Sequence, residues 1–347
     1  MNFSATVTSV TREAIVPKVY DTLLKGNVGL LRLLGNARPW RSGFRYDVPI
    51  RYTRANTGGL VGIGGTLDTS RADTRTKMQF NPKRRHKPVV IDDVEKQLNK
   101  GDEQVLELLA TEMETLASEL LDEAGNDFYT GTGSGENFDS ILNASDDSTS
   151  FSTYGSLARA TYTTIKGYLA TSIGVLATSD MATAYNAVKV GQDKPSVILA
   201  DVTSWTAYEG LLQPTVRAGY EANGFPQVTR TGVIASQRAL GGDIGFDSIY
   251  YRGTPLVEDE KCTSGYQFYL NEKYFYFAGV DLDDYEKINL TGDKVDGPQN
   301  IPVPRGFNWS GLLRGTQQPA EVGHLYIIGN YIAYDPRRAG NLQGITG

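Results

Sequence analysis

The sequence contains two histidines and one cysteine, side chains that often carry acid-base, nucleophilic or metal chemistry. His86 lies within the run Lys83-Arg-Arg-His-Lys87, and His324 begins an apolar strand. The sequence has no GxSxG, HExxH or CxxC pattern, so it lacks the parts of a hydrolase triad or a zinc site. We therefore expect structural histidines, a buried or half-buried Cys262, no metal or cofactor, and no enzymatic activity.

Three further segments resemble ligand-binding loops only superficially. Gly62–Gly65 and Gly131–Gly135 are rich in glycine, but neither has the Gly-Lys-Ser/Thr sequence that a phosphate-binding loop places before its helix. Asp281-Leu-Asp283-Asp284 lacks the glycine and the spaced oxygen ligands of a calcium loop. Flexible loop tips and a solvated turn explain these segments better.

The run Lys83–Lys87 is the densest basic cluster and could bind nucleic acid or an acidic protein surface. No aromatic residue interleaves with it to stack on bases, and it lies between two strand segments. A contact with an acidic face of a neighbouring copy explains it at least as well. A DNA-binding module therefore stays open as an alternative, which would require salt-dependent binding by the monomer.

Composition and charge narrow the class of protein. The 347 residues suffice for about two domains, and a single cysteine cannot form an internal disulfide, which suits a reducing cytoplasm. No segment reaches the roughly 18–20 apolar residues of a membrane helix, so we expect no membrane contact. The net charge of -6 is uneven: residues 1–91 hold 16 Lys and Arg against 5 Asp and Glu, whereas the rest holds 18 against 35. A basic first quarter joined to an acidic body favours binding between copies.

The first 91 residues read as an arm followed by a ribbon. The arm, 1–43, contains a helical stretch at 12–24 and an apolar cluster at 28–34. From Phe44 to Thr53 apolar and polar residues alternate strictly, which indicates a half-buried strand. After the glycine-rich segment, alternation resumes at Lys77 and ends in an apolar run at Ile91. The pattern predicts a long β-hairpin over 44–91 that packs on a neighbouring copy, with an internal sheet as the competing interpretation.

The clearest helix spans 102–128 and has one apolar and one acidic face. The apolar stripe recurs at helical spacing in Val105, Leu109, Met113, Leu116 and Leu120. The opposite face carries Glu107, Glu112, Glu114, Glu119, Asp122 and Glu123. At about 1.5 Å per residue the helix would be about 40 Å long.

Residues beyond 150 predict an α+β domain. Helical patterns lie near 156–169, 180–190 and 204–212, and strand patterns at 195–199, 246–257 and 266–277. A final apolar strand covers 324–334.

This order of parts resembles the major capsid proteins of tailed bacteriophages, the Hong Kong 97-type fold that encapsulin nanocompartments share. The resemblance rests on Gly131-Thr-Gly133 with Ser140-Ile-Leu142, on Pro195–Leu199 before Trp205 and Tyr208, and on Tyr250–Val257 before the strand at 266–270. It implies an α+β fold with an N-terminal arm (1–43), an extended loop (44–91), a peripheral domain (92–149 and 290–347) with its spine helix at 102–128, and an axial domain (150–289).

The function that the resemblance implies is a virion shell. Hexamers and pentamers of the chain would close into an icosahedral capsid around double-stranded DNA, assembled in the host cytoplasm. A portal protein and, because Met1 leads almost directly into the arm, a separate scaffolding protein are implied partners; whether decoration proteins cover the shell stays open. An encapsulin-like cargo compartment is the nearest alternative.

The resemblance also selects the residues that we expect at contacts between copies. On the extended loop these are Arg45, Tyr46, Val48, Ile50, Arg51, Met78, Phe80, Lys83, Arg84 and Arg85. On the acidic face of the spine helix they are Glu107, Glu112, Glu114 and Glu119.

Overall fold

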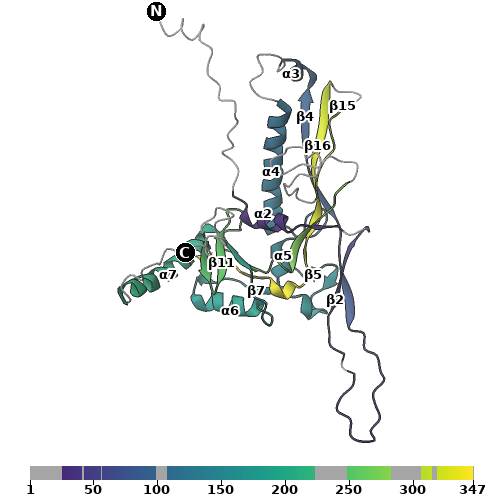
Figure 1. Cartoon of the computed structure of the whole chain (residues 1–347), viewed down its shortest axis with the longest axis vertical. Coiled ribbons are helices and arrows are strands. Elements are labelled where there is room, and N and C mark those ends of the chain that lie inside the picture. The colour runs from purple at the N-terminus through teal and green to yellow at the C-terminus, as the bar shows by residue number, and fades with distance from the viewer. Residues whose placement is uncertain are drawn as a thin grey trace, which may run out of the picture.

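A computed structural model describes residues 26–40, 43–55, 57–98, 108–222, 248–282, 306–314 and 319–346. Two six-stranded β-sheets, a long helix and a projecting hairpin make up most of the described chain (Figure 1). The predicted α+β class is confirmed. The helix predicted at 12–24 and Glu107 lie outside the described residues, as do Asp283 and Asp284. No described helix is long and apolar enough to span a bilayer.

The first sheet is organised by β16 (Ala320–Ala333), which pairs with strands from four other parts of the chain. Leu325 and Ile327 are buried, whereas His324 before them and Tyr326 between them are half-buried, so one face of the strand carries the core. Its neighbours are β4 (Lys83–Asp92), β13 (Phe275–Gly279), β14 (Phe307–Trp309) and β15 (Leu313–Arg314), and β1 (Arg38–Pro39) follows beyond β13.

Helix α4 (Leu108–Thr130) packs along β4 and β16 and confirms that the segment predicted at 102–128 is helical over its described part. Its buried side chains recur every three or four residues, as an amphipathic helix requires. They are Met113, Ala117, Leu120, Ala124 and Phe128. The shorter α2 (Val28–Gly35) forms from the apolar cluster that the sequence placed at 28–34.

The second sheet forms a domain with its own core. Its strands in order are β10 (Ser248–Tyr251), β11 (Thr254–Glu258), β9 (Val197–Ala200), β12 (Gln267–Leu270), β17 (Gly340–Leu342) and β7 (Tyr168–Ala170). Helices α6 (Thr178–Val188) and α7 (Val202–Ala222) accompany it. The side chains of Met181, Ile198, Leu256 and Tyr269 are fully buried between these elements.

Small elements complete the described chain. They are α3 (Asp93–Leu98), α5 (Ile141–Ser145), β5 (Thr153–Tyr154), β6 (Leu157–Ala158), η1 (Thr163–Ile165), β8 (Gly174–Val175), η2 (Pro336–Arg338) and β18 (Ile345–Thr346).

The hairpin is shorter than the predicted range 44–91. Only β2 (Tyr46–Arg51) and β3 (Arg75–Phe80) pair with each other, and residues 52–74 form the tip. The stretch predicted as the rest of the ribbon is β4, which pairs over its whole length with β16. Pairing of β4 with β16 is more favourable than continuing the hairpin, because it buries Val89 and Ile91 in the core of the first sheet.

Three other predicted elements are wrong in type or extent. Residues 156–169 form no α-helix and only the short 3-10 helix η1, because Gly155 and Ser156 adopt left-handed φ angles of 54° and 63° that turn β5 into β6. The described part of the strand predicted at 246–257, from Ser248 on, forms two strands, because Arg252 and Gly253 make a left-handed turn between β10 and β11. The strand predicted at 266–277 is also two strands, β12 and β13, in different sheets.

The last described residues leave the first sheet, contrary to the range 290–347 predicted for one domain. Strand β17 inserts between β12 and β7 of the second sheet, and β18 pairs with β8. The strand expected to be the final one, at 324–334, is therefore followed by two more.

Packing at Gly323 yields a stability prediction. A Cβ at this position would lie 2.1 Å from the ring of Trp309, which is 1% exposed. We expect Gly323→Ala to lower the free energy of unfolding by roughly 1–3 kcal/mol, because a buried indole must move. Urea unfolding measures this change.

The matched control is Gly210→Ala in the exposed part of α7, where an added Cβ meets nothing within 4 Å. Alanine should stabilise the helix there by roughly 0.5–1 kcal/mol. Equal shifts for the two variants would contradict the packing described for Trp309.

Candidate assembly surfaces

Within the described residues, the potentially reactive side chains do not gather into a catalytic or metal site. His86 and His324 lie on neighbouring strands with ring centroids 5.7 Å apart, beside Tyr326. No group of three or more His, Cys, Asp or Glu residues in the described ranges could hold a metal ion. Cys262 is buried, and burial raises the pKa of its thiol well above the ordinary value. The following surfaces are the places where the described part of the chain could contact another molecule.

The apolar face of the hairpin stem is already buried by its own chain. Tyr46, Val48, Met78 and Phe80 are each at most 4% exposed. The Tyr46 hydroxyl lies 3.1 Å from that of Tyr334 and 3.3 Å from that of Tyr276 in the first sheet. The sequence analysis predicted these four residues at contacts between copies, but in the structure they attach the stem to the body of their own chain.

The side chains that the stem exposes to solvent are mainly charged. Arg45 and Arg51 are exposed, and Ile50 is half-buried. Lys77 pairs with Asp47 across the stem at 2.6 Å, so this lysine is partly neutralised. Of the predicted stem residues, the two arginines and Ile50 remain available to another chain.

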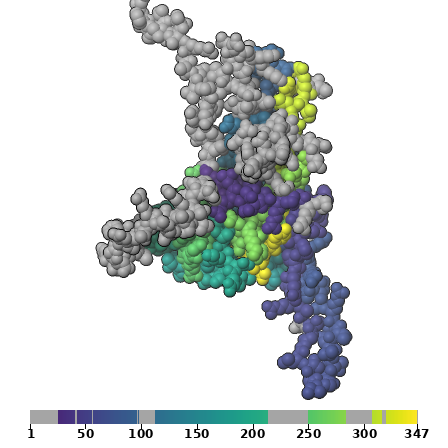
Figure 2. Space-filling view, viewed as in Figure 1, coloured from purple at the N-terminus to yellow at the C-terminus, as the bar shows by residue number. Residues whose placement is uncertain are grey.

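The hairpin tip exposes large apolar side chains. Leu60 and Ile63 are as exposed as in an extended chain, and Leu67 is 72% exposed. Asp68 shapes the loop by accepting hydrogen bonds from the backbone N–H groups of Gly58 and Ser70. Figure 2 shows the hairpin standing clear of the body. Exposed aliphatic residues on a projecting loop are typical of a surface that another protein covers.

The basic cluster of β4 is divided between the two faces of the first sheet. Arg85 forms a bidentate pair with Asp127 of α4, with Nε 2.6 Å from Oδ2, and also contacts Glu123 at 2.9 Å. Lys87 contacts Glu123 at 2.6 Å and Glu119 at 3.3 Å. These residues join β4 to α4 within one chain.

Arg84 points to the opposite side from Arg85, with its guanidinium 5.5 Å from the centre of the Tyr326 ring. The Lys83 ammonium donates to the backbone carbonyl of Gly135. The cluster expected to bind a neighbour is thus used largely inside the chain.

The pKa values of two carboxylates in this charged layer shift in opposite directions. Burial raises the pKa of Asp127 above its ordinary value, and the bond from Arg85 offsets this only in part. Burial also acts on Glu123, but hydrogen bonds from Lys87 and Arg85 outweigh it and lower the pKa of that group. Of the predicted acidic face, Glu119 is therefore partnered within the chain, whereas Glu112 and Glu114 are exposed.

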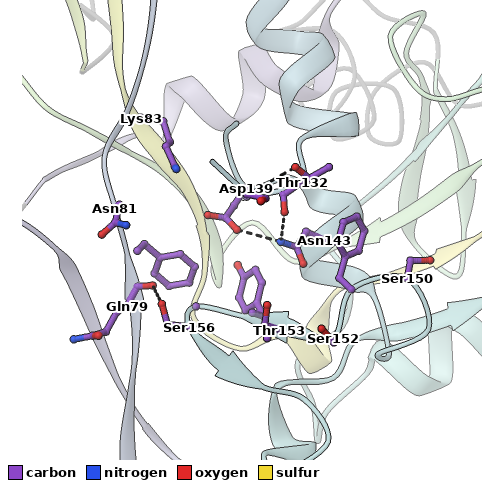
Figure 3. A pocket seen from close by; sticks show the side chains of 16 residues that line it. Gln79, Asn81, Lys83, Thr132, Asp139, Asn143, Ser150, Ser152, Thr153 and Ser156 are labelled. Atoms are coloured by element: carbon purple, nitrogen blue, oxygen red, sulfur yellow. Dashed lines mark hydrogen bonds between the residues drawn. The ribbon is translucent and has the colours of Figure 1, made fainter. Parts of the chain in front are cut away.

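A polar cavity of about 560 Å³ lies at the base of the hairpin (Figure 3). At its wall the carboxylate of Asp139 accepts hydrogen bonds from the side-chain amides of Asn330, at 2.8 Å, and Asn143, at 3.2 Å. The Asn330 amide also donates to the backbone carbonyl of Asn81, which joins β3 to β4. One buried side chain of β16 thus positions both the hairpin base and the loop after α4.

Arg159 is 0% exposed and donates at 3.4 Å to the side-chain carbonyl of Asn143, which lines this cavity. Its guanidinium lies 3.5 Å from the Asp146 carboxylate and donates to the backbone carbonyl of Phe151 at 2.8 Å. The sequence analysis missed Asp139, Arg159 and Asn330. A single Asp or Arg in a loop pattern reads as a solvated residue, and only long-range packing reveals that each is buried.

A search of solved structures finds chains that share this fold over their full length. A chain of the cyanophage A-1(L) capsid asymmetric unit superposes with a TM-score of 0.72 at 14% identity, covering 99% of both chains. The capsid of the native GTA particle gives 0.58 at 10% identity, covering 100% of this chain and 99% of the other. The holo-SrpI encapsulin complex from Synechococcus elongatus PCC 7942 gives 0.55 at 11%, covering 100% and 96%. No family model and no curated protein matches the sequence.

The ion pairs between β4 and α4 yield a second prediction. Arg85→Ala should lower the free energy of unfolding by about 1–3 kcal/mol, because it leaves the largely buried carboxylate of Asp127 without its partner. Arg84→Ala removes the same side chain from the adjacent residue on the other face and should cost less than about 1 kcal/mol. Urea unfolding of both variants measures the difference, and equal losses would contradict the assignment of Arg85 to this layer.

The buried carboxyl of Asp139 yields a prediction about pH. Burial raises the pKa of Asp139 from 3.8 to about 6. The carboxyl of Asp139 binds its proton more tightly in the folded than in the unfolded state, so protonation stabilises the folded state. This stabilisation is complete below about pH 4 and is lost as the pH rises through about 6. The unfolding free energy of the wild type relative to Asp139→Asn should therefore fall by about 3 kcal/mol over this interval.

Asp68→Asn is the control for the sign of this effect. Hydrogen bonds from Ser70 lower the pKa of Asp68, so its contribution should instead be lost as the pH falls. A flat difference between wild type and Asp139→Asn across pH 4–7 would contradict the buried, proton-binding state of Asp139.

Proposed function

From the Hong Kong 97-type fold of this chain, we propose that it is the major capsid protein of a tailed bacteriophage. Copies would assemble into hexamers and pentamers that form an icosahedral shell around double-stranded DNA. The observation that carries the proposal is the match over 99% of both chains to a capsid chain of cyanophage A-1(L). The role proposed is structural and needs no catalytic residue.

The parts of the fold correspond to capsid regions as follows in this proposal. Residues 1–43 are the N-terminal arm, and the extended loop is 44–80, shortened from 44–91 because β4 belongs to the first sheet. The first sheet with α4 is the peripheral domain. The second sheet with α6 and α7 is the axial domain, and it includes the residues of β17.

Contacts between copies then depend on what the hairpin leaves exposed. Leu60, Ile63 and Leu67 at the tip would bury their apolar surface against a neighbouring chain, at roughly 25 cal/mol for each Å² removed from water. Arg45 and Arg51 on the stem would face acidic side chains of that neighbour, for which Glu112 and Glu114 of α4 are exposed candidates.

Other partners follow from the same proposal. A scaffolding protein would guide closure of the shell, a portal protein would replace one pentamer, and DNA would fill the particle, with assembly in the host cytoplasm. Decoration proteins are left open.

A cargo-holding compartment is the second candidate, because an encapsulin has the same fold. The contents of purified particles separate the two functions. Nuclease-resistant DNA supports the virus shell, and a packaged enzyme supports the compartment.

Assembly itself is the first test. We expect negative-stain microscopy to show closed shells or ring-shaped capsomers when the chain is expressed alone or with candidate scaffolding proteins. A chain that stays monomeric under all these conditions would contradict the proposal and return the basic hairpin to the nucleic-acid hypothesis.

The hairpin tip can be tested with matched double variants. Leu60→Ser with Ile63→Ser should reduce the yield of closed particles at least about tenfold without changing the midpoint of thermal unfolding, since neither side chain packs on its own chain. Thr66→Ala with Thr69→Ala alters equally exposed loop positions and should leave the yield unchanged. Normal assembly of the serine variant would refute the role of the tip.

A further inference from the structure

The two ends of the second sheet carry opposite charge. Strands β9, β11 and β17 are mutually aligned, and β12 runs antiparallel between β9 and β17. The turns before β9, β11 and β17 and the turn after β12 therefore gather at one end of the sheet. The segments after β9 and β11 gather at the opposite end, roughly 13–17 Å away for strands of four or five residues.

The first of these ends is basic. Five exposed cationic side chains lie in its turns: Lys189, Lys194, Arg252, Lys273 and Arg337. Arg338 and Lys273 both contact Asp193, at 3.1 and 3.9 Å, which places their segments in one cluster. Lys194 joins the turn between β10 and β11 to that cluster by donating to the Gly253 carbonyl.

The cations of this basic end outnumber its acids. Among the residues that the structure describes, only Asp193 and Asp335 supply carboxylates to these cations, since Glu272 is paired with Arg32 of α2 at 2.8 Å. A net positive surface therefore remains, on a chain whose overall charge is -6.

The opposite end is acidic and hollow. A cavity of about 420 Å³ is lined by the carboxylates of Glu209, Glu258 and Glu260 together with Trp205. Within the described part of the chain, no cation pairs with any of the three glutamates; Glu260 accepts only from the backbone N–H of Gly26.

Other charges at the acidic end are used internally. Lys261 is bound to Asp122 at 2.5 Å, so this cation does not neutralise the cavity. Asp201 accepts from the first N–H groups of α7, and Asp259 accepts from Gly29 N–H and the Tyr129 hydroxyl. As far as the described residues go, three carboxylates beside the indole of Trp205 thus have no cationic partner, a combination that suits a guanidinium or ammonium group.

We propose that the basic end of one copy docks on the acidic end of the next, so that the second sheets join head to tail. A contact between two different surfaces of the same chain repeats from copy to copy, and it closes into a ring when the rotation between copies divides a full turn. The partner is a second copy of this chain, because it alone is certain to carry the complementary end at equal concentration. This inference rests on the proposed capsid function and specifies how subunits of one capsomer recognise each other.

Charge reversal tests the contact in both directions. One variant carries Glu209→Lys, Glu258→Lys and Glu260→Lys, and a second carries Lys189→Glu, Lys194→Glu and Lys273→Glu. Each variant alone would bring like charges together and should form at least about tenfold fewer rings or shells than the wild type. Mixed in equal amounts, the two variants restore opposite charges at every contact when they alternate, so rings should return with an even number of subunits.

The control variant carries Glu95→Lys in α3 and Glu136→Lys in the loop after α4, which are exposed and belong to neither end; it should retain most of the ring yield. Circular dichroism shows whether each variant is folded, and recovery in the mixture shows it independently.

If the wild type assembles and each variant assembles equally well alone, or if two folded variants fail to recover in the mixture, the head-to-tail contact is overturned while the capsid function stands. If the wild type itself never assembles, the capsid function fails instead.

Discussion

Hydrogen bonding to β16 is the constraint on which most of this structure depends. The strand pairs with β4 along one edge and with β13, β14 and β15 along the other, so segments separated by more than 200 residues are held in register by one backbone. The side chain of Asn330 extends this role beyond the sheet, since its amide contacts both the hairpin base and Asp139. The orientation of the hairpin is thereby set by a strand that lies about 240 residues later in the chain.

Charge is used in this protein at two levels. Arg85 and Lys87 are consumed within the chain, where they neutralise the face of α4 that lies against β4. Such partly buried pairs add little net stability compared with apolar packing, but they penalise any arrangement that separates the partners. The charges left at the hairpin and at the two ends of the second sheet remain solvated in a single copy. A surface of this kind keeps the free chain soluble and still favours association in one orientation.

Local patterns predicted the parts of the fold whose cause is local. The spine helix followed from apolar residues at helical spacing, and the strand at 46–51 followed from strict alternation. The partner of β4 could not be predicted, because its alternation fits a hairpin and a sheet equally well and the choice depends on β16, far along the chain. Turns at Gly155–Ser156 and Arg252–Gly253 were missed because serine and arginine rarely adopt left-handed φ angles. The candidate surfaces were also predicted only in part. Leu60 and Ile63 were not selected as contact residues, because they lie in a glycine-rich loop. Tyr46 and Val48 were predicted at contacts between copies, but they are buried within their own chain.

The place of β17 has a consequence for synthesis. This strand lies in the interior of the second sheet, between β12 and β7, yet it follows every other strand of that sheet in the chain. While the chain emerges from a ribosome, β7 has no partner strand and the sheet stays divided until β17 has been translated. A nascent chain therefore cannot present a finished second sheet to its neighbours. The topology therefore ties completion of the second sheet to the translation of β17, the last of its strands along the chain.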